Sequence, residues 1–165
     1  MAGSQQIYAV GELGLWWPGG SGTPALEALA SLAPRSVCIA NPAFAPYGEA
    51  AGALLQSADL APDWLQSVVR VDNVNLVAGL IAEGHTTAGF VARSSLMSGK
   101  RQGTVVAADE DVLWFAEQAA IDQAMVLLTR AEKNTAARHW VEQIQAAPIR
   151  ELIQRDGYLL PVEQD

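Results

Sequence analysis

The chain has 165 residues, of which 50% are hydrophobic and 17% charged, and its formal net charge is −8 at pH 7. This length is enough to bury the core of one domain. The acidic balance argues against a nucleic-acid-binding protein, because contact with phosphates needs clustered Lys and Arg. No apolar run reaches the ~18 residues that a membrane span needs, so the sequence also argues against membrane insertion.

The start of the chain, MAGSQQIYAVGELG, has neither a basic segment nor a long apolar run. A signal peptide needs both. We therefore expect the chain as encoded to be cytoplasmic, unless an export segment has been removed. The single cysteine, Cys38, allows no internal disulfide. Because Cys38 lies within an apolar run, we expect it to pack in a core rather than to react.

Apolar runs bounded by Gly, Pro and polar residues predict the strands. In chain order, the predicted strands are Leu13–Trp17, Ser36–Ala40, Val68–Val71, Ala88–Ala92, Thr104–Ala107 and Ala124–Leu128. The polar run Ser98–Gly103 is predicted to be a turn between two of them.

Apolar residues at helical spacing predict helices between the strands. The first predicted helix is capped by Thr23 and ended by Pro34, and the second covers 48–57 with Ala50, Ala53 and Leu54 on one side. A helical spacing follows around Trp64, and a further helix runs from Asp72 or Asn73 to Gly84. Two helices close the chain: one around 134–144 that buries Ala137, Trp140, Val141 and Ile144, and one from Pro148 to Gly157 that buries Ile149, Leu152 and Ile153. The alternation predicts an α/β fold, a three-layer sandwich with a largely parallel central sheet.

The loop NPAFAPYG, residues 41–48, is the most informative stretch. It connects a predicted buried strand to a predicted helix. Its two prolines, Pro42 and Pro46, have a fixed φ and hold the backbone before Tyr47 and Gly48 stiff. The first amides of a helix have no partner within the helix and lie at the positive end of its dipole. The loop therefore predicts a binding site for an anion.

Other candidate chemistry is weak. His85 and His139 have no Cys or carboxylate at the spacing of metal ligands. The acidic run Asp109-Glu110-Asp111 indicates a solvated turn, because a calcium site needs more oxygen ligands in a preset loop. The hydroxyls of Ser94 and Ser95 have no base in a recognisable motif nearby. We therefore expect no metal, no cofactor and no enzyme activity.

Several stretches resemble the periplasmic molybdate-binding proteins, which are the solute receptors of molybdate ABC transporters. The matching stretches follow the family's order from about Leu13 to Pro161: LGLWWP (13–18), NPAFAPYGEAAGALL (41–55), DNVNLVAGLIAEG (72–84), TTAGFVARS (87–95), AMVLL (124–128), NTAARHWVEQI (134–144) and IRELIQRDGYLLP (149–161). The resemblance implies a lobe of the type II periplasmic-binding-protein fold.

The resemblance also implies site residues. The family binds its oxyanion with backbone amides of the APYG loop and of the next helix start, which here correspond to Tyr47 and Val74. A third position carries a tyrosine in the family and is Ala92 here, which has no hydroxyl. The implied ligands are molybdate, tungstate or sulfate. On the residues alone, the favoured interpretation is that Tyr47 anchors the loop and Val74 is a core residue at a helix start; with the resemblance, an inherited anion site is favoured.

The sequence departs from the family in its extent. The family has two lobes with a hinge between them, and serine or threonine ligands lie in a part of the first lobe that this chain lacks. We expect residues 1–12 to be a leader without a family match, 13–118 a complete oxyanion-binding lobe, and 119–165 a remnant of the other lobe. The sequence thus predicts a truncated receptor whose ligand binding is weak or depends on a partner.

Two functional classes remain open. The first is an oxyanion-binding protein that works alone, with a separate first-lobe chain or with an ABC permease. The second is a self-associating interaction or structural module that has lost its ligand. Because the C-terminal helices present apolar stripes that a first lobe would cover in the family, we expect a homodimer.

Overall fold

The computed structural model describes residues 5–20 and 24–162, which form two compact units. One unit is the continuous segment 12–121. The other combines the described residues of two segments, 5–11 and 122–162. The larger unit contains a sheet of five strands and the smaller unit a sheet of three. The 12–121 unit is therefore inserted between the two segments of the smaller unit.

The sheet of the 12–121 unit has the strand order β4-β3-β5-β2-β6. Its strands are β2 (Leu13–Trp16), β3 (Val37–Ala40), β4 (Val69–Val71), β5 (Ala88–Ala92) and β6 (Val112–Trp114). Strand β3 is parallel to both β4 and β5, whereas β2 is antiparallel to both β5 and β6. Four of the five strands therefore run in one direction, and the predicted largely parallel sheet is confirmed.

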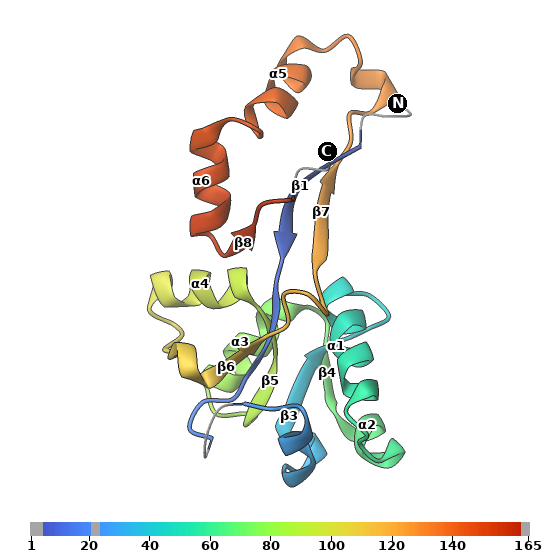
Figure 1. Ribbon diagram of the computed structural model, residues 1–165, viewed down its shortest axis with the longest axis vertical. Coiled ribbons are helices and arrows are strands. Elements are labelled where there is room, and N and C mark those ends of the chain that lie inside the picture. The colour runs from blue at the N-terminus through green and yellow to red at the C-terminus, as the bar shows by residue number, and fades with distance from the viewer. Residues whose placement is uncertain (1–4, 21–23, 163–165) are drawn as a thin grey trace. The chain divides into compact units, whose positions relative to one another are not determined.

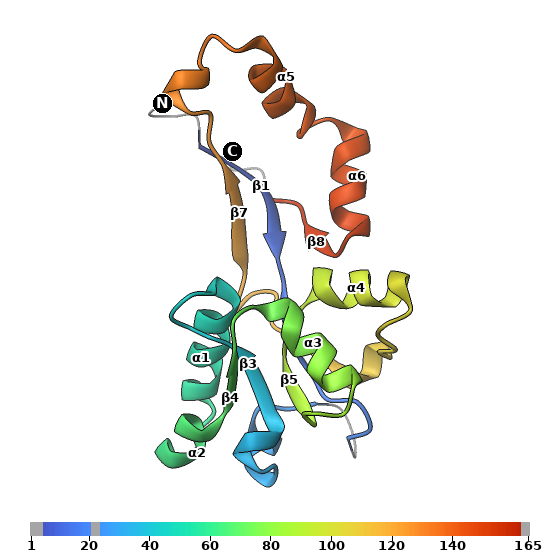
Figure 2. The same cartoon turned by 180° about the vertical axis from the view of Figure 1, so that it is seen from behind.

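Helices cover both faces of this sheet (Figures 1 and 2). They are α1 (Pro46–Ser57), α2 (Pro62–Ser67), α3 (Val74–Ala82) and α4 (Arg93–Gln102), with 3-10 turns at Glu27–Ser31, Pro34–Ser36 and Asp109–Asp111. Helices α1 and α2 pack on one face, and α3 and α4 on the other. The predicted three-layer α/β sandwich is therefore confirmed.

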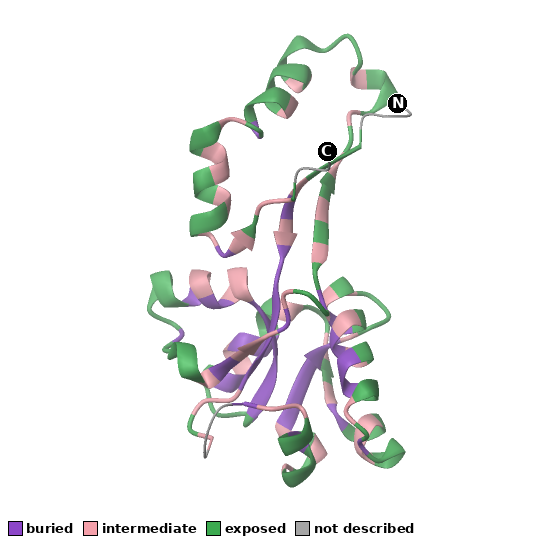
Figure 3. Ribbon diagram, in the orientation of Figure 1, coloured by how far each residue is buried: buried purple, intermediate pink, exposed green. Residues whose placement is uncertain are grey.

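Side chains that alternate along the strands build one core on each face. The first core joins the sheet to α1 and includes Leu13, Leu15, Val37, Ile39, Ala51, Leu54, Leu55, Phe90 and Phe115. The second core joins the sheet to α3 and α4 and includes Trp16, Cys38, Val77, Ala78, Ile81, Val91 and Leu96. Because both faces are covered, the central strands are buried throughout (Figure 3).

The smaller unit has a sheet of strand order β7-β1-β8. Its elements are β1 (Gln6–Gly11), β7 (Ile121–Met125), β8 (Tyr158–Leu159), a 3-10 turn at Thr129–Ala131, α5 (Thr135–Gln143) and α6 (Ala147–Arg155). Strands β1 and β8 are antiparallel, with Val10 opposite Leu159. The segment expected to be a leader therefore contributes a strand, and its partner comes from the far end of the chain.

Helix α4 corrects the prediction of a polar turn at Ser98–Gly103. Within α4 only Leu96 and Gly99 are buried, and most of its other residues are polar, so the segment has the composition of an exposed turn. Gly103 ends the helix with a φ of +70°, as expected for a glycine at a helix C-terminus. The predicted turn residues therefore form the last turns of a helix.

Two of the predicted strands differ from those in the structure. Residues 104–107 form no strand, and the sheet instead uses β6 at Val112–Trp114. Val105 is buried, but Val106 is 91% exposed. The segment after α4 therefore packs mainly through Val105 and does not form a strand. The strand predicted at Ala124–Leu128 is shifted to Ile121–Met125, where half-buried and exposed residues alternate.

The helix predicted to end at Pro34 is mostly a 3-10 turn, Glu27–Ser31, whose only buried residue is Leu29. With one buried contact, little packing favours the longer helix. Its predicted cap, Thr23, lies outside the described residues.

The buried faces of three other helices also differ from the prediction. In α1 the buried side is Gly48, Ala51, Leu54 and Leu55, while Ala53 is exposed. In α5 and α6 the predicted core residues Trp140 and Leu152 are 62% and 40% exposed.

Candidate functional site

Three helices of the 12–121 unit start at the carboxyl ends of three adjacent parallel strands. Strand β3 leads through the loop 41–45 into α1, β4 leads through residues 72–73 into α3, and β5 leads directly into α4. Ligands of open α/β sheets bind at this edge. The positive ends of three helix dipoles lie there together.

The loop before α1 is fixed by backbone contacts to the ends of two strands. The Asn41 amide donates to the carbonyl of Val71 at 2.7 Å, which ties the loop to β4. The Asn41 side-chain oxygen accepts from the Ala43 amide at 3.0 Å. A Cβ placed on Gly48 would lie 2.3 Å from the carbonyl oxygen of Ala40. The first turn of α1 therefore sits directly on the end of β3, in contact that only glycine permits.

The start of α3 is capped by Asn73. Its side-chain oxygen accepts hydrogen bonds from the amides of Asn75 and Leu76, at 3.1 and 3.3 Å. Asn75 in turn accepts a 2.6 Å hydrogen bond from the hydroxyl of Ser95 in the first turn of α4. The first turns of α3 and α4 are thereby joined. The sequence predicted the cap, which follows from Asp-Asn before an apolar helix, but not the link between the two helices.

The start of α4 is held by a buried acid. Glu12 is 4% exposed, and its carbonyl accepts from the Arg93 amide at 3.0 Å. The Arg93 guanidinium donates to the Glu12 carboxylate at 2.5 Å and lies 5.3 Å above the centre of the Trp114 ring. Sequence reasoning missed all three residues, because they lie far apart in the chain and form no motif.

The structure brings the three predicted site residues to the same edge of the sheet. Tyr47 is half-buried in the first turn of α1, Val74 is the half-buried first residue of α3, and Ala92 precedes α4 and is 1% exposed. Within the part of the chain that the structure describes, no side chain caps α1 or α4. The edge therefore offers main-chain donors at helix starts, and Ala92 adds no side-chain donor.

Among the described residues, no group of three or more His, Cys, Asp and Glu side chains is placed to hold a metal ion. Burial raises the pKa of the Cys38 thiol to about 11, and this side chain packs in the second core. In the described residues, no helix has the length and apolar character to cross a bilayer.

Comparison with known proteins identifies the class. The model of the bacterial extracellular solute-binding protein family matches residues 1–159. The chain therefore belongs to this family, and the predicted resemblance is confirmed. The matched region begins at residue 1 and so includes the segment expected to lie outside the match.

Within this family the chain is similar to molybdate-binding proteins. It is 28% identical over 157 residues to the molybdate-binding protein ModA of Rhodobacter capsulatus, and 31% identical over 163 residues to ModA of Azotobacter vinelandii. The matches cover 95% and 96% of this chain but only 60% and 62% of the two relatives.

The fold is similar to that of a solved relative. The Azotobacter vinelandii periplasmic molybdate-binding protein matches 98% of this chain with a TM-score of 0.78 at 22% identity, and 70% of that protein is covered. The chain thus has the fold of this protein over a shorter length.

Proposed function

We propose that the chain is a solute-binding protein for a tetrahedral oxyanion, and that its ligand is molybdate, tungstate or sulfate. The observation that carries the proposal is the meeting of three helix starts at one sheet edge, with Tyr47 and Val74 in the first turns of α1 and α3. Main-chain amides there can donate to anionic oxygens without a charged side chain. The similarity to molybdate-binding proteins favours the same ligand class. In this proposal the chain binds its ligand and does not catalyse a reaction.

We further propose that binding by this chain alone is weak. The chain spans 60% and 62% of two molybdate-binding relatives, and in this proposal the part of such a protein that it does not span carries further ligand donors. Ala92 also has no hydroxyl to offer. Each lost hydrogen bond to a charged ligand costs roughly 1.5–3 kcal/mol. Tight binding would then require a partner that supplies the missing donors, and a separate first-lobe chain or an ABC permease is the partner that the family resemblance implies.

The smaller unit favours a second candidate function, a self-associating module. Its exposed large apolar residues are Ile7, Val126, Leu128, Trp140, Leu152, Leu159 and Val162. Monomeric proteins rarely expose large contiguous apolar patches, and self-association would cover these side chains where they lie together. In this alternative the chain is a homodimer whose role no longer needs the oxyanion.

The proposed ligand contact can be tested at a single amide. Val74 is the first residue of α3, and Asn73 before it is extended, with φ −150° and ψ 163°. Proline is well tolerated at the first helical position and requires such a preceding residue. Val74→Pro therefore removes one N–H and leaves the helix intact, whereas Val74→Ala keeps the N–H and shortens only the side chain.

Calorimetry with sodium molybdate should show weak, saturable binding to the unmodified chain and to Val74→Ala. We expect Val74→Pro to weaken it about tenfold or more, as for loss of one hydrogen bond to a charged group. Circular dichroism checks that both variants are folded. Equal affinity of the two variants would overturn the assigned contact. Sub-micromolar binding by the unmodified chain would contradict the proposed weakness, and no binding at any accessible concentration would favour the self-associating module.

A further inference from the structure

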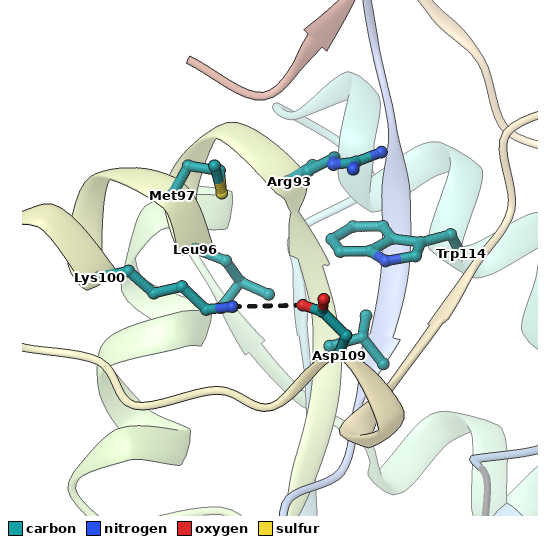
Figure 4. Close-up of a pocket in the computed structure, with 7 residues that line it drawn as sticks. Arg93, Leu96, Met97, Lys100, Asp109 and Trp114 are labelled. Atoms are coloured by element: carbon teal, nitrogen blue, oxygen red, sulfur yellow. Dashed lines mark hydrogen bonds and ion pairs between the residues drawn. The ribbon is translucent and has the colours of Figure 1, made fainter. Parts of the chain in front are cut away.

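The face of α4 that carries Arg93 borders a pocket of 290 Å³ (Figure 4). The pocket lies between α4 and the segment that contains β6, within the 12–121 unit. Its lining residues are Arg93, Leu96, Met97, Lys100, Asp109, Val112 and Trp114. None of the residues predicted for the oxyanion is among them. The pocket is therefore a second place at which this unit can hold a ligand.

Apolar side chains form one part of the pocket wall, and the charged side chains of Arg93, Lys100 and Asp109 form the other. Leu96 and Val112 are 2% and 8% exposed and belong to the second core. Met97 projects from the α4 side, and the indole of Trp114 lies across from it (Figure 4). Thioether sulfur and indole both make favourable contacts with aromatic rings. The volume is at the lower end of the range for small-molecule sites, which suits a ligand with one ring.

The two cations at the rim are held very differently. Arg93 is fixed between the buried carboxylate of Glu12 at 2.5 Å and the ring of Trp114, so its charge is already balanced. Among the described residues, the ammonium of Lys100 makes one long ion pair, at 3.5 Å from Asp109, whose side chain is 100% exposed. A contact of this kind contributes little to stability and is readily exchanged. The ammonium of Lys100 is therefore available to another carboxylate.

We propose that this pocket binds a small aromatic carboxylate. The carboxylate takes the place of Asp109 beside Lys100, and the ring lies between Met97 and Trp114 over Leu96. Bringing a carboxylate and an ammonium together in a partly enclosed site strengthens their hydrogen bond relative to an exposed pair. Asp109 then competes with the ligand for the ammonium of Lys100, so removing the charge of Asp109 should tighten ligand binding.

The probe is 3-phenylpropionate, added to the full chain and followed by calorimetry and by NMR of the methyl groups. We expect saturable binding with shifts at Leu96, Met97 and Val112, and binding of the neutral 3-phenylpropan-1-ol at least about tenfold weaker. Shifts confined to other parts of the chain, or equal binding of the acid and the alcohol, would overturn the proposal.

Charge variants on the same helix give the matched comparison. Lys100→Gln should weaken binding of 3-phenylpropionate about tenfold or more. Arg101→Gln removes the same charge at the next position, which does not line the pocket, and should leave the affinity unchanged. Asp109→Asn removes the competitor and should tighten binding about 1.5- to 5-fold. Equal effects of the Lys100 and Arg101 variants, or weaker binding after Asp109→Asn, would contradict the assigned role of Lys100.

Discussion

Arg93 holds Glu12 by two hydrogen bonds, one from its guanidinium to the carboxylate at 2.5 Å and one from its main-chain amide to the Glu12 carbonyl at 3.0 Å. Glu12 is the first residue of the 12–121 unit, and Arg93 is the first residue of α4. The pair therefore joins the point where the chain enters the unit to the helix start beside Ala92. A buried carboxylate without a partner is costly. Loss of Arg93 and loss of Glu12 should therefore lower the free energy of unfolding by different amounts.

This asymmetry predicts different costs for removing either partner. Arg93→Ala leaves the Glu12 carboxylate buried and unpaired, and we expect a loss of about 2–3 kcal/mol in the free energy of unfolding. That is below the ~3–5 kcal/mol of a fully buried pair, because the Arg93 side chain is 42% exposed. Glu12→Gln removes the buried charge itself and should cost only about 1 kcal/mol. Urea unfolding of both variants measures the difference, and a larger loss for Glu12→Gln would contradict this account.

Gly48 and Gly52 lie in the same helix, α1, but in different surroundings. A Cβ on Gly48 would meet the Ala40 carbonyl at 2.3 Å, whereas a Cβ on Gly52 would meet nothing within 4 Å. Gly48→Ala should therefore lower the free energy of unfolding by about 1–3 kcal/mol through overpacking against β3. Gly52→Ala should raise it by about 0.5–1 kcal/mol through better helix propensity.

The two glycine variants should also differ in their effect on ligand binding. Gly48→Ala should displace the first turn of α1 and weaken any binding of molybdate, while Gly52→Ala should leave that binding unchanged. Thermal melts and calorimetry on both proteins are the measurements. If Gly48→Ala were as stable as Gly52→Ala, the loop would not be packed on β3 as described.

Cys38 is 0% exposed, which confirms the predicted burial, and burial raises the pKa of its thiol to about 11. At pH 8 the thiol is therefore protonated and inaccessible, and only the thiolate is the nucleophile. We expect Ellman's reagent to react slowly with the folded protein and rapidly once urea is added. Prompt stoichiometric labelling of the native chain would show that β3 is not covered on this face.

The same thiol affects stability at high pH. Its ordinary pKa is 9.0, and the folded-state value is about 11. The unfolded chain therefore releases the proton first, and the stability that the neutral thiol contributes is present below pH 9 and lost as the pH rises from 9 to 11. Cys38→Ala lacks this dependence, so the unmodified protein should lose more stability than the variant over that range. Parallel slopes for the two proteins would contradict the raised pKa.

The sequence predicted the central strands and the helix starts beside them because each leaves a strong local signal. Runs such as SVCIA and AGFVA are apolar on both faces, and Asn73 precedes an apolar helix. Helix α4 was missed because its sequence, RSSLMSGKRQ, is mostly polar and buries only Leu96 and Gly99. Its position follows from tertiary contacts, with Arg93 bound to Glu12 and Gly99 against Val105.

At the candidate site, too, the sequence predicted the residues with a local signal and missed the contacts between distant residues. Tyr47 and Val74 could be placed from the loop motif and from the family resemblance, since both depend on main-chain geometry that nearby residues set. The pairs Ser95–Asn75 and Arg93–Glu12 connect residues distant in the chain. Neither pair has a spacing or composition that distinguishes it from ordinary surface residues. Only the folded arrangement of β2, β5 and the helices brings these side chains together.

The smaller unit exposes a large aromatic side chain, Trp140. Trp140 is 62% exposed in α5, and no residue within the described helices α5 and α6 is buried. Full burial of such a side chain is worth roughly 1.5–3 kcal/mol, so an apolar stripe of this kind favours association. We therefore predict a homodimer, because closed two-fold dimers are the commonest oligomers. Light scattering of the unmodified protein across the micromolar range should give the dimer mass.

Trp140→Asp places a charge within the predicted contact and should give a monomer or, if the contact also holds the unit together, an unfolded chain. His139→Asp adds the same charge to the same helix on the side away from Val141 and Ile144, and it should remain a dimer. Circular dichroism separates dissociation from unfolding in both variants. A monomeric mass for the unmodified protein with normal solubility would refute the dimer, because the exposed tryptophan would then be tolerated without a partner.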